Sequence, residues 1–366
     1  MKFVVVGYGS RGDVEPCAAV ARELLRRGHE VRLAVPRMML GFVKSAGIAA
    51  VAYGPDSDAV LQDLVSVLRN PLSASPHVAA HVNQIKAEKD ATLKALVDGA
   101  DLLLAGITEQ PLAANVANQY RIPLAALHFF PTQFLQPGSL QVSGPSARPL
   151  EIQAYDGLCF PELAHDDDRR PFVGALTLEL PTDHDDDVLA WIAAGTPPIY
   201  FGFGDITVES PSDLVAVITE TCAQIGERAL VCSGPNDIAG ISYLDHVKVV
   251  PTVNHATVFP ACRAVVHHGG AGTTAAGLRA GIPSLILWNG LDQPMWADAV
   301  ERLKVGRGGH FPKTTVESLV ADLRALLAPE YLTRAREVAA LMNKPVDSVA
   351  SCADLLEHTA RGGRVD

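Results

Sequence analysis

The sequence predicts an α/β protein with two Rossmann-like domains, each built around a doubly wound parallel sheet. The chain has 366 residues, which is too long for one ordinary α/β domain and enough for two domains with their own cores. Short apolar runs of strand length recur along it, and alanine- and leucine-rich stretches of helical length follow them. This alternation is typical of parallel strands joined by crossover helices, and it occurs once in each half of the chain.

Each half supplies the strands of one sheet. In the first half we expect strands at 3–6, 30–35, 102–105 and 124–128, with helices near 16–27 and 110–120. The second half repeats the pattern, with strands expected at 199–203, 229–232, 247–250, 264–267 and 284–288. Because the strands alternate with helical segments, both sheets should be parallel and buried on two faces.

The connection between the halves is expected near residues 161–187, where several prolines accompany two acidic runs. Such a composition indicates an exposed segment. We therefore divide the chain into a first domain at 1–165, a linker at 166–190, a second domain at 191–345, and a closing helix and tail at 346–366. Apolar residues at helical spacing predict that helix, for which packing back on the first domain is one option.

Composition and charge favour a small-molecule partner. Hydrophobic residues make up 48% of the chain and charged residues 19%, which is ordinary for a folded α/β protein. The formal net charge of -11 opposes binding to nucleic acid or to anionic lipid by bulk attraction. Six cysteines occur singly, without the spacing of a zinc site or a disulfide framework, and fit a reducing compartment.

The expected location is the cytoplasm. The chain begins with a buried-strand pattern, KFVVVGYG, rather than with a charged region and a cleavable apolar stretch. The sequence contains no uninterrupted apolar run of about 18 residues, so a membrane-spanning helix is not expected. Peripheral contact with the inner face of the membrane stays open.

A glycine-rich loop follows the first strand. The residues GYGSRG at 7–12 match the G-x-G-x-x-G pattern of dinucleotide sites, yet the next strand ends without the acidic residue that binds ribose hydroxyls. Asp13 and Glu15 stand at the beginning of the following helix, where their charge would repel a pyrophosphate. Asp13, which precedes Pro16 in an expected first turn, either caps this helix or projects into the crevice as a general base.

The strongest local signal is the run HHGGAGTT at 267–274, which lies between a buried strand and an alanine-rich helix. A helix that begins after a glycine turn presents free backbone N–H groups and the positive end of its dipole, and glycines let a diphosphate approach closely. His268 and Thr273 add side-chain donors. A bare turn would account for one glycine but hardly for the whole run, so the pattern favours a phosphate site.

Polar residues after the next strand are expected to face that turn. Asp292 and Gln293 follow the strand that ends at Trp288, at the crevice edge of a parallel sheet, where they suit sugar hydroxyls. A helix cap accounts for them equally well. His267 and His268 are adjacent on a strand and point to opposite faces, so they are not expected to bind a metal together.

Two weaker signals have plain structural explanations. The acidic runs at 166–168 and 185–187 resemble the D-x-D clamp for a divalent cation but are interpreted as solvated linker. His77 and His81 have the i, i+4 spacing of a helical metal site without a third ligand, and they are interpreted as ordinary helix residues. No metal site is therefore expected.

Four motifs occur together in one order: SRGDVEP at 10–16, PPIYFGFG at 197–204, HHGGAGTT at 267–274 and LDQPMWA at 291–297. This combination resembles the two-domain glycosyltransferases of family 1, in the bacterial branch that modifies glycopeptide antibiotics and cell-surface lipids. The resemblance covers nearly the whole chain and is nearest to mycobacterial enzymes that glycosylate glycopeptidolipids. It implies the GT-B fold, in which two Rossmann-like domains face a central cleft.

The resemblance also implies roles for individual residues. Asp13 would deprotonate the acceptor hydroxyl, His268 would hold the donor diphosphate, and Asp292 with Gln293 would bind the donor sugar. The remaining donor contacts expected are Ser10, Arg11, Gly12, Gly204, Val253 against the nucleobase, Gly269, Gly270, Ala271, Gly272, Thr273 and Trp288. Metal independence is implied as well, since a helix N-terminus and a histidine can stabilise the leaving diphosphate in place of a cation.

Two departures from the family pattern stand out. Asp205 occupies the position after FGFG at which relatives carry a serine or threonine that donates to the diphosphate, and its charge opposes phosphate binding. The chain is also short between Pro131 and Glu151, where relatives carry acceptor-binding segments. Either these regions are truly shorter than in relatives, or flexible segments are absent from the sequence, in which case Asp205 would not directly follow Gly204. We favour absent segments.

The function expected is that of a metal-independent, inverting hexosyltransferase. It would move a hexose or deoxyhexose from a nucleoside diphosphate sugar to a hydroxyl of a lipid, lipopeptide or natural-product acceptor. No cofactor beyond the donor is expected, and a dTDP-sugar is favoured over a UDP-sugar because the bacterial relatives use it. Two alternatives stay open: a nucleotide-sugar epimerase on the same fold, and a nucleotide-binding module that has lost catalysis. Nucleic acid is not an expected partner.

Overall fold

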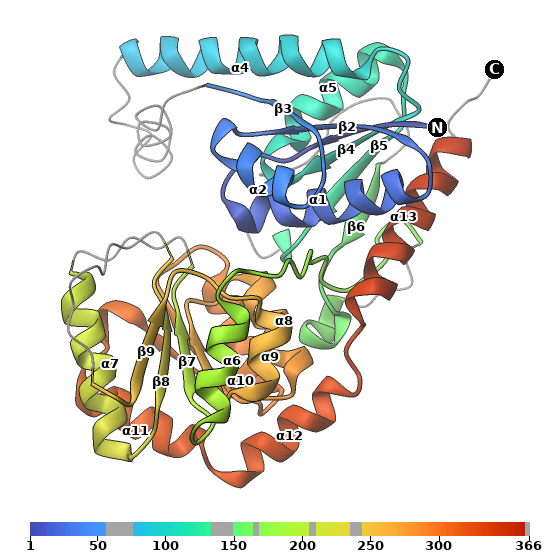
Figure 1. The fold of residues 1–366 in the computed structure, drawn as a ribbon. Coiled ribbons are helices and arrows are strands. Elements are labelled where there is room, and N and C mark those ends of the chain that lie inside the picture. The colour runs from blue at the N-terminus through green and yellow to red at the C-terminus, as the bar shows by residue number, and fades with distance from the viewer. Residues whose placement is uncertain (56–75, 133–148, 164–167, 205–209, 235–243, 363–366) are drawn as a thin grey trace. The chain divides into compact units, whose positions relative to one another are not determined.

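The computed structural model describes residues 1–55, 76–132, 149–163, 168–204, 210–234 and 244–362, without the side chains of 76–81 (Figure 1). The chain divides into two compact units. The first unit comprises Met1–Ala154, Asp166–Leu178 and Pro345–Asp366, and the second comprises Tyr155–His165 and Glu179–Lys344. The expected linker at 166–190 is thus shared between the two units, and the closing segment from Pro345 belongs to the first.

The first unit is built on a six-stranded parallel sheet with the spatial order β3-β2-β1-β4-β5-β6. Its strands are β1 (Lys2–Val6), β2 (Glu30–Val35), β3 (Ala50–Ala52), β4 (Leu102–Gly106), β5 (Leu124–His128) and β6 (Leu150–Gln153). The strand order reverses between β1 and β4. Ligands of doubly wound sheets bind beyond the carboxyl ends of the strands at such a switch point, so the loops after β1 and β4 are the ones to inspect.

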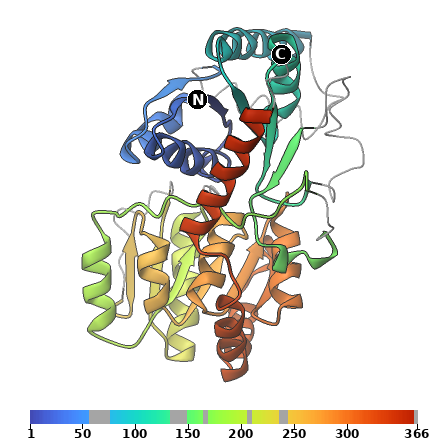
Figure 2. The ribbon, with the colours of Figure 1, turned by 90° about the vertical axis from the view of Figure 1, so that its right-hand side faces the viewer.

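Helices cover both faces of this sheet (Figures 1 and 2). The helices are α1 (Arg11–Arg26), α2 (Leu40–Ser45), α4 (Pro76–Val97), α5 (Gln110–Tyr120) and α13 (Pro345–Gly362). Successive residues of β1 point to opposite faces, and Val4 and Val6 pack with Leu93 of α4 and Val116 of α5. On the other side α13 lies against α1, where Arg27 binds the carboxylates of α13.

The second unit repeats this architecture with the order β12-β11-β10-β7-β8-β9. Its strands are β7 (Ile199–Gly202), β8 (Ala229–Cys232), β9 (Val247–Val250), β10 (Ala264–His267), β11 (Ser284–Trp288) and β12 (Gly306–His310). The order reverses between β7 and β10, so the switch point here lies beyond Gly202 and His267. The two doubly wound units expected from the alternating pattern are confirmed.

Two sets of helices enclose the second sheet (Figure 1). They are α6 (Asp185–Ala193), α7 (Pro211–Ile225), α8 (His255–Val258), α9 (Ala271–Ala280), α10 (Gln293–Arg302), α11 (Val316–Leu326) and α12 (Pro329–Ala339). Alternate strand residues again divide between the faces. Phe201 packs with Ile218 of α7 and Leu323 of α11, whereas Tyr200 packs with Ile192 of α6 and Val258 of α8.

The first helix begins earlier than the sequence indicated. We expected it at 16–27, with Asp13 ahead of it and Pro16 in its first turn, but α1 begins at Arg11 with Ser10 as the N-cap residue. Pro16 therefore lies in the second turn, buried inside the helix. Asp13 stands at the third helical position, where an acidic side chain can accept from the backbone of the N-cap residue.

The acidic run at 185–187 is not a solvated linker. These residues form the first turn of α6, and Asp185 is buried with 6% of its surface exposed. Its carboxylate accepts hydrogen bonds from the backbone N–H groups of Thr182 and Asn254 and from the Thr182 hydroxyl. Carboxylates are favourable at a helix N-terminus because of the helix dipole, which explains their clustering here. Among the described residues, none of the helices combines the length and the apolar character that crossing a bilayer requires.

Candidate active site

The loop between β1 and α1 holds Asp13 in a defined position at the switch point of the first sheet. Oδ2 of Asp13 accepts the backbone N–H of Ser10 at 2.8 Å and the Ser10 hydroxyl at 3.3 Å. The backbone of Gly9 adopts a φ of 139°, and a Cβ there would lie 2.2 Å from the same carboxylate oxygen. The loop therefore wraps closely around a half-buried carboxylate, which caps its own helix.

The neighbours of Asp13 are engaged within the first unit. The Arg11 guanidinium pairs with Glu15 at 2.7 Å and lies over the Phe42 ring at 4.9 Å, so its charge is already balanced locally. A Cβ at Gly12 would meet only the Ser10 hydroxyl, at 3.8 Å, which is an ordinary contact. The expected donor contacts of Ser10, Arg11 and Gly12 stay predictions.

In the second unit, β10 runs into α9 through the glycine turn. His267 ends β10 fully buried, and its Nδ1 accepts the backbone N–H of Gly269 at 3.1 Å. Burial, followed by the neighbouring His268 and His255, lowers the pKa of His267 well below its usual value. The ring is therefore neutral, and its acceptor nitrogen fixes the path of the turn. The amide of Gly269 is consequently engaged by the protein itself.

The N-terminus of α9 has the geometry of an anion site. Gly270 is the N-cap residue and offers no capping side chain, while its carbonyl accepts the amide and the hydroxyl of Thr274, both at 2.9 Å. The amides of the first turn, at Ala271, Gly272 and Thr273, point out of the helix end by helical geometry. Together with the helix dipole they can receive the oxygens of a diphosphate.

The imidazole of His268 lies between two glycines. A Cβ at Gly270 would lie 2.6 Å from its Nε2, and a Cβ at Gly204 would lie 2.6 Å from its Cε1. Gly204, which follows β7, also has a φ of 59°, in the region that favours glycine. The structure thus brings together three of the expected donor residues, His268, Gly204 and Gly270, at the switch point of the second sheet.

Asp292 and Gln293 lie beside the same turn. A Cβ at Gly269 would be 3.1 Å from Cβ of Gln293, so the turn and the beginning of α10 are in close contact. Oε1 of Gln293 accepts the backbone N–H of Asn289 at 2.8 Å, which leaves its Nε2 as the group that can donate to a sugar. Oδ2 of Asp292 accepts Nε1 of Trp296 at 3.0 Å, and burial raises the pKa of Asp292.

Two further expected contacts have different surroundings. The Trp288 ring lies at the carboxyl end of β11 and packs against His310 at 4.6 Å between ring centroids. Sequence reasoning missed His310, because the strand that it ends, GRGGH, has no apolar pattern. Val253 is 4% exposed and belongs to the core of the second unit, and its expected contact with the nucleobase stays a prediction.

Some expectations fall outside the described residues. Asp205 is one of them, as are 133–148 and the side chains of His77 and His81. Within the part of the chain that the structure describes, no group of three or more His, Cys, Asp or Glu residues is arranged to hold a metal ion.

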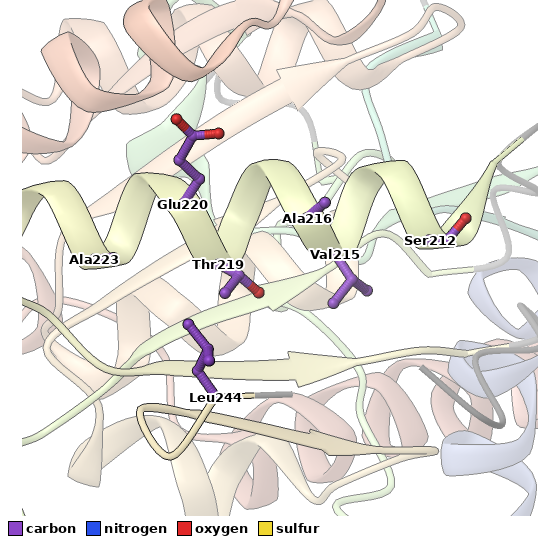
Figure 3. Close-up of a pocket in the computed structure, with 7 residues that line it drawn as sticks. All are labelled: Ser212, Val215, Ala216, Thr219, Glu220, Ala223 and Leu244. Carbon is purple, nitrogen blue, oxygen red and sulfur yellow. The ribbon is translucent and has the colours of Figure 1, made fainter. Parts of the chain in front are cut away.

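A separate cavity of about 420 Å³ lies along α7 in the second unit (Figure 3). Thr219 points from this helix toward Leu244 and Val215 points to the same side of the helix, whereas Glu220 points to the opposite side (Figure 3). The lining residues are Ser212, Val215, Ala216, Thr219, Glu220, Ala223 and Leu244. None of them comes from the turn after β10 or the beginning of α10, so this cavity is distinct from the site described above.

Two family models match the sequence: the glycosyltransferase family 28 N-terminal domain at residues 3–92, and the C-terminal domain of erythromycin biosynthesis protein CIII-like proteins at residues 219–353. The chain is also 52% identical over 414 aligned positions to an uncharacterized glycosyltransferase of Mycobacterium tuberculosis, with 100% of both chains covered. The chain belongs to the bacterial family 1 glycosyltransferases with the GT-B fold.

More distant proteins share the architecture of this glycosyltransferase. A sterol 3-beta-glucosyltransferase of Arabidopsis thaliana is 26% identical over 414 positions, which cover 97% of this chain and 67% of that protein. The crystal structure of the kitacinnamycin glycosyltransferase has a TM-score of 0.73 at 18% identity, with 98% of this chain and 99% of that chain covered. SsfS6 of Streptomyces sp. SF2575, complexed with thymidine diphosphate, has a TM-score of 0.68 at 21% identity, with 97% and 99% covered. At these identities the two structures establish the fold.

The alignment with the mycobacterial relative is longer than this glycosyltransferase. It runs over 414 positions, whereas the chain has 366 residues, all of which are included. That relative therefore carries segments that have no counterpart in this chain.

Proposed function

We propose that the protein is an inverting glycosyltransferase that transfers a hexose or deoxyhexose from a nucleoside diphosphate sugar, with dTDP favoured over UDP, to a hydroxyl of a lipid, lipopeptide or natural-product acceptor. The observation that carries the donor half of the proposal is the end of α9, where uncapped amides and His268 converge beside Asp292 and Gln293. The complex of SsfS6 with thymidine diphosphate and the sterol acceptor of the plant relative support the choice of donor and acceptor class.

In this proposal the reaction is a single displacement. The acceptor oxygen forms a bond to the anomeric carbon while the bond from that carbon to the diphosphate breaks, and Asp13 takes the hydroxyl proton. The departing diphosphate gains negative charge, which the amides of Ala271 to Thr273 and the His268 ring stabilise. Because attack and departure occur on opposite faces of the sugar, the anomeric configuration inverts. The positive end of α9 then supplies the role that a divalent cation has in other transferases.

The donor sugar is recognised in this proposal by the beginning of α10. The Gln293 amide donates to one sugar hydroxyl, and the carboxylate of Asp292 accepts from another. Burial raises the pKa of Asp292, but its bond from Trp296 opposes that shift and favours the ionised form that accepts from the sugar.

A transfer assay with a panel of dTDP- and UDP-hexoses and a hydroxyl-bearing lipid tests the proposal. We expect nucleoside diphosphate release that depends on the acceptor, with an inverted anomeric centre in the product. Asp13→Asn should lower kcat by about 100-fold or more without weakening the binding of thymidine diphosphate. Asp347→Asn, which removes an exposed carboxylate from the first turn of α13, is the matched control and should retain full activity.

Other outcomes identify the alternatives. Turnover of the nucleotide sugar without acceptor would support an epimerase. A wild-type protein that binds thymidine diphosphate but transfers nothing would support a binding module. Failure of both thymidine and uridine diphosphates to bind would refute the donor site itself.

A further inference from the structure

A buried cluster of charged and aromatic side chains contacts the loop between β1 and α1, which precedes Asp13. Nζ of Lys89, on α4, donates to Oε1 of Glu109 at 2.8 Å, and the Tyr53 hydroxyl donates to Oε2 of the same carboxylate at 2.6 Å. Glu109 ends the short 3-10 helix that follows β4, and Tyr53 follows β3. Glu109 is 3% exposed, Tyr53 1% and Lys89 9%.

Burial of this pair is expensive. Removing a carboxylate and an ammonium from water costs several kcal/mol for each ion, so a buried pair is a weak source of stability compared with apolar packing. Such a pair does fix geometry, because its hydrogen bonds hold side chains from α4 and from the carboxyl ends of β3 and β4 in defined positions. The cluster therefore calls for a geometric explanation rather than an energetic one.

The cluster packs against Tyr8, which lies in the loop between β1 and α1. Nζ of Lys89 lies 3.1 Å from the centroid of the Tyr8 ring, and the Tyr53 ring meets that ring edge-on at 6.1 Å. A Cβ at Gly54 would lie 2.7 Å from Cε2 of Tyr8, so the ring is packed tightly on that side too. A cation held against an aromatic face out of water is attracted by the negative charge of that face.

The main chain of the loop is held from the same side. The Thr108 hydroxyl, next to Glu109, donates to the carbonyl of Tyr8 at 2.9 Å. Tyr8 is followed by Gly9, where a Cβ would lie 2.2 Å from Oδ2 of Asp13, and by Ser10, whose N–H donates to that oxygen. Only Gly9 thus separates Tyr8 from Ser10, whose N–H binds the Asp13 carboxylate.

We propose that Glu109 is a positioning residue for the reaction: it orients Lys89 and Tyr53 against Tyr8, and so holds the loop that aims Asp13 at the acceptor hydroxyl. This inference rests on the proposed role of Asp13 as the base. Every residue in the chain of contacts belongs to the first unit, and none of them is part of the donor site in the second.

Replacing the carboxylate with an amide tests the inference. Glu109→Gln should lower kcat by about 10- to 100-fold, the range expected when a reacting group is misplaced by a fraction of an ångström to one ångström. Its KM for the nucleotide sugar and its affinity for thymidine diphosphate should stay within about twofold of wild type. Glu109→Asp keeps the carboxylate and should retain more activity than Glu109→Gln. Tyr53→Phe removes only one hydrogen bond to Glu109 and should also retain more activity than Glu109→Gln.

The matched control is Glu23→Gln. Glu23 lies on the same helix as Asp13, 12% exposed, and its carboxylate binds Arg26 and Arg27, so its replacement also removes a partly buried ion pair. We expect it to lower the melting temperature without a fall in kcat. If Glu23→Gln loses as much kcat as Glu109→Gln at the same loss of stability, the role of Glu109 is merely structural and the inference is wrong.

A double-variant cycle makes the test specific to Asp13. If Glu109 acts only through Asp13, adding Glu109→Gln to Asp13→Asn should leave the residual transfer rate unchanged within about twofold, because coupled groups are not additive. Independent, multiplied losses would overturn the inference. Full activity of Asp13→Asn would instead refute the proposed function, so the two failures are distinguishable.

A readout without catalysis completes the design. Hydrogen exchange, followed by mass spectrometry on a peptide that covers 7–14, reports the bond from Ser10 N–H to Asp13. Exchange there should be faster in Glu109→Gln than in Glu23→Gln or wild type. Unchanged exchange in Glu109→Gln would contradict the proposal that Glu109 holds the loop in place. This test does not require a known acceptor.

Discussion

The room around the His268 ring depends on residues that have no side chain. Gly270 has an ordinary extended backbone, with φ of -63°, so a β-branched residue is allowed there by its own dihedral angles. Its substitution is costly only because Nε2 of His268 lies 2.6 Å from where Cβ would be. This separates a steric effect on the ligand site from a general effect on the fold.

We therefore predict that Gly270→Val weakens the binding of thymidine diphosphate by at least about tenfold, equivalent to about 1.4 kcal/mol. The displaced imidazole no longer completes the site at the end of α9. Isothermal titration calorimetry measures the affinity directly. The control is Gly41→Val, at an exposed helical glycine whose Cβ would meet nothing within 4 Å. Equal affinity of Gly270→Val and wild type would mean that His268 does not bind the diphosphate.

His128 provides a test of pH dependence in the first unit. It ends β5 with 4% of its surface exposed, and burial, assisted by the charge of Arg170, lowers its pKa to about 4. An unfolded chain protonates this residue near pH 6.5 while the folded chain does not. Its contribution to stability is thus complete above pH 6.5 and is lost as the pH falls towards 4.

We expect wild type to lose about 2 kcal/mol more stability between pH 7 and pH 5 than His128→Gln, in which the titrating group is absent. Urea unfolding at the two pH values measures this difference. Removal of the ring will itself destabilise the protein, but only the change with pH bears on the prediction. Parallel losses in the two proteins would contradict a buried neutral His128.

The position of a strand in its sheet explains which strands the sequence predicts and which it does not. Central strands such as β1 are buried on both faces and read as continuous apolar runs, so they were predicted. The strands that were missed, β3, β6 and β12, are all edge strands. An edge strand has one neighbour and needs few apolar side chains, and the GRGGH sequence of β12 carries none of the usual pattern.

The extent of α1 illustrates a second limit. A proline usually marks the first turn of a helix, so Pro16 indicated a start five residues later than the start at Arg11. Capping of the helix by Asp13, one of the two interpretations of this residue, is present. The position of Asp13 as the third helical residue could not be predicted, because it depends on the start at Arg11. The partners of Glu109 could not be foreseen either, because Tyr8, Tyr53 and Lys89 converge only through the sheet order.

The closing helix α13 is held on the first unit by apolar burial as well as by ion pairs. Leu356 and Cys352 are fully buried, and Arg27 at the end of α1 pairs with Asp354 at 2.6 Å and Glu357 at 3.0 Å. Partly exposed ion pairs contribute little, about 1 kcal/mol or less each. The apolar contacts should therefore dominate the attachment of this helix.

We predict that Leu356→Ala destabilises the first unit by about 2–5 kcal/mol, the usual cost of deleting a buried leucine side chain. Val346→Ala, on the same helix but 71% exposed, should change stability by less than about 0.5 kcal/mol. Chemical denaturation of the two variants measures both. Similar, small effects of the two substitutions would show that burial does not hold α13 in place.

The division of the chain into two units predicts how the whole molecule responds to its donor. The proposed contacts to the diphosphate and the donor sugar, from Gly204 to Gln293, belong to the second unit, whereas the first unit contributes Asp13 and its supporting cluster. A ligand stabilises only what it binds, by about 2.7 kcal/mol at a concentration 100 times its Kd. Thymidine diphosphate should therefore act on one unit, with the other as an internal control.

We expect two unfolding steps in urea, distinguished by tryptophan fluorescence, because Trp191, Trp288 and Trp296 all lie in the second unit. Saturating thymidine diphosphate should move the step reported by tryptophan to higher urea by the equivalent of about 2–3 kcal/mol. Hydrogen exchange of β1 and β4, which reports the first unit, should change little. A nucleotide that protects both units equally would mean that the donor contacts extend to the loop before Asp13. The assignment of Ser10 and Arg11 to the donor would then gain support over the local roles that their hydrogen bonds indicate.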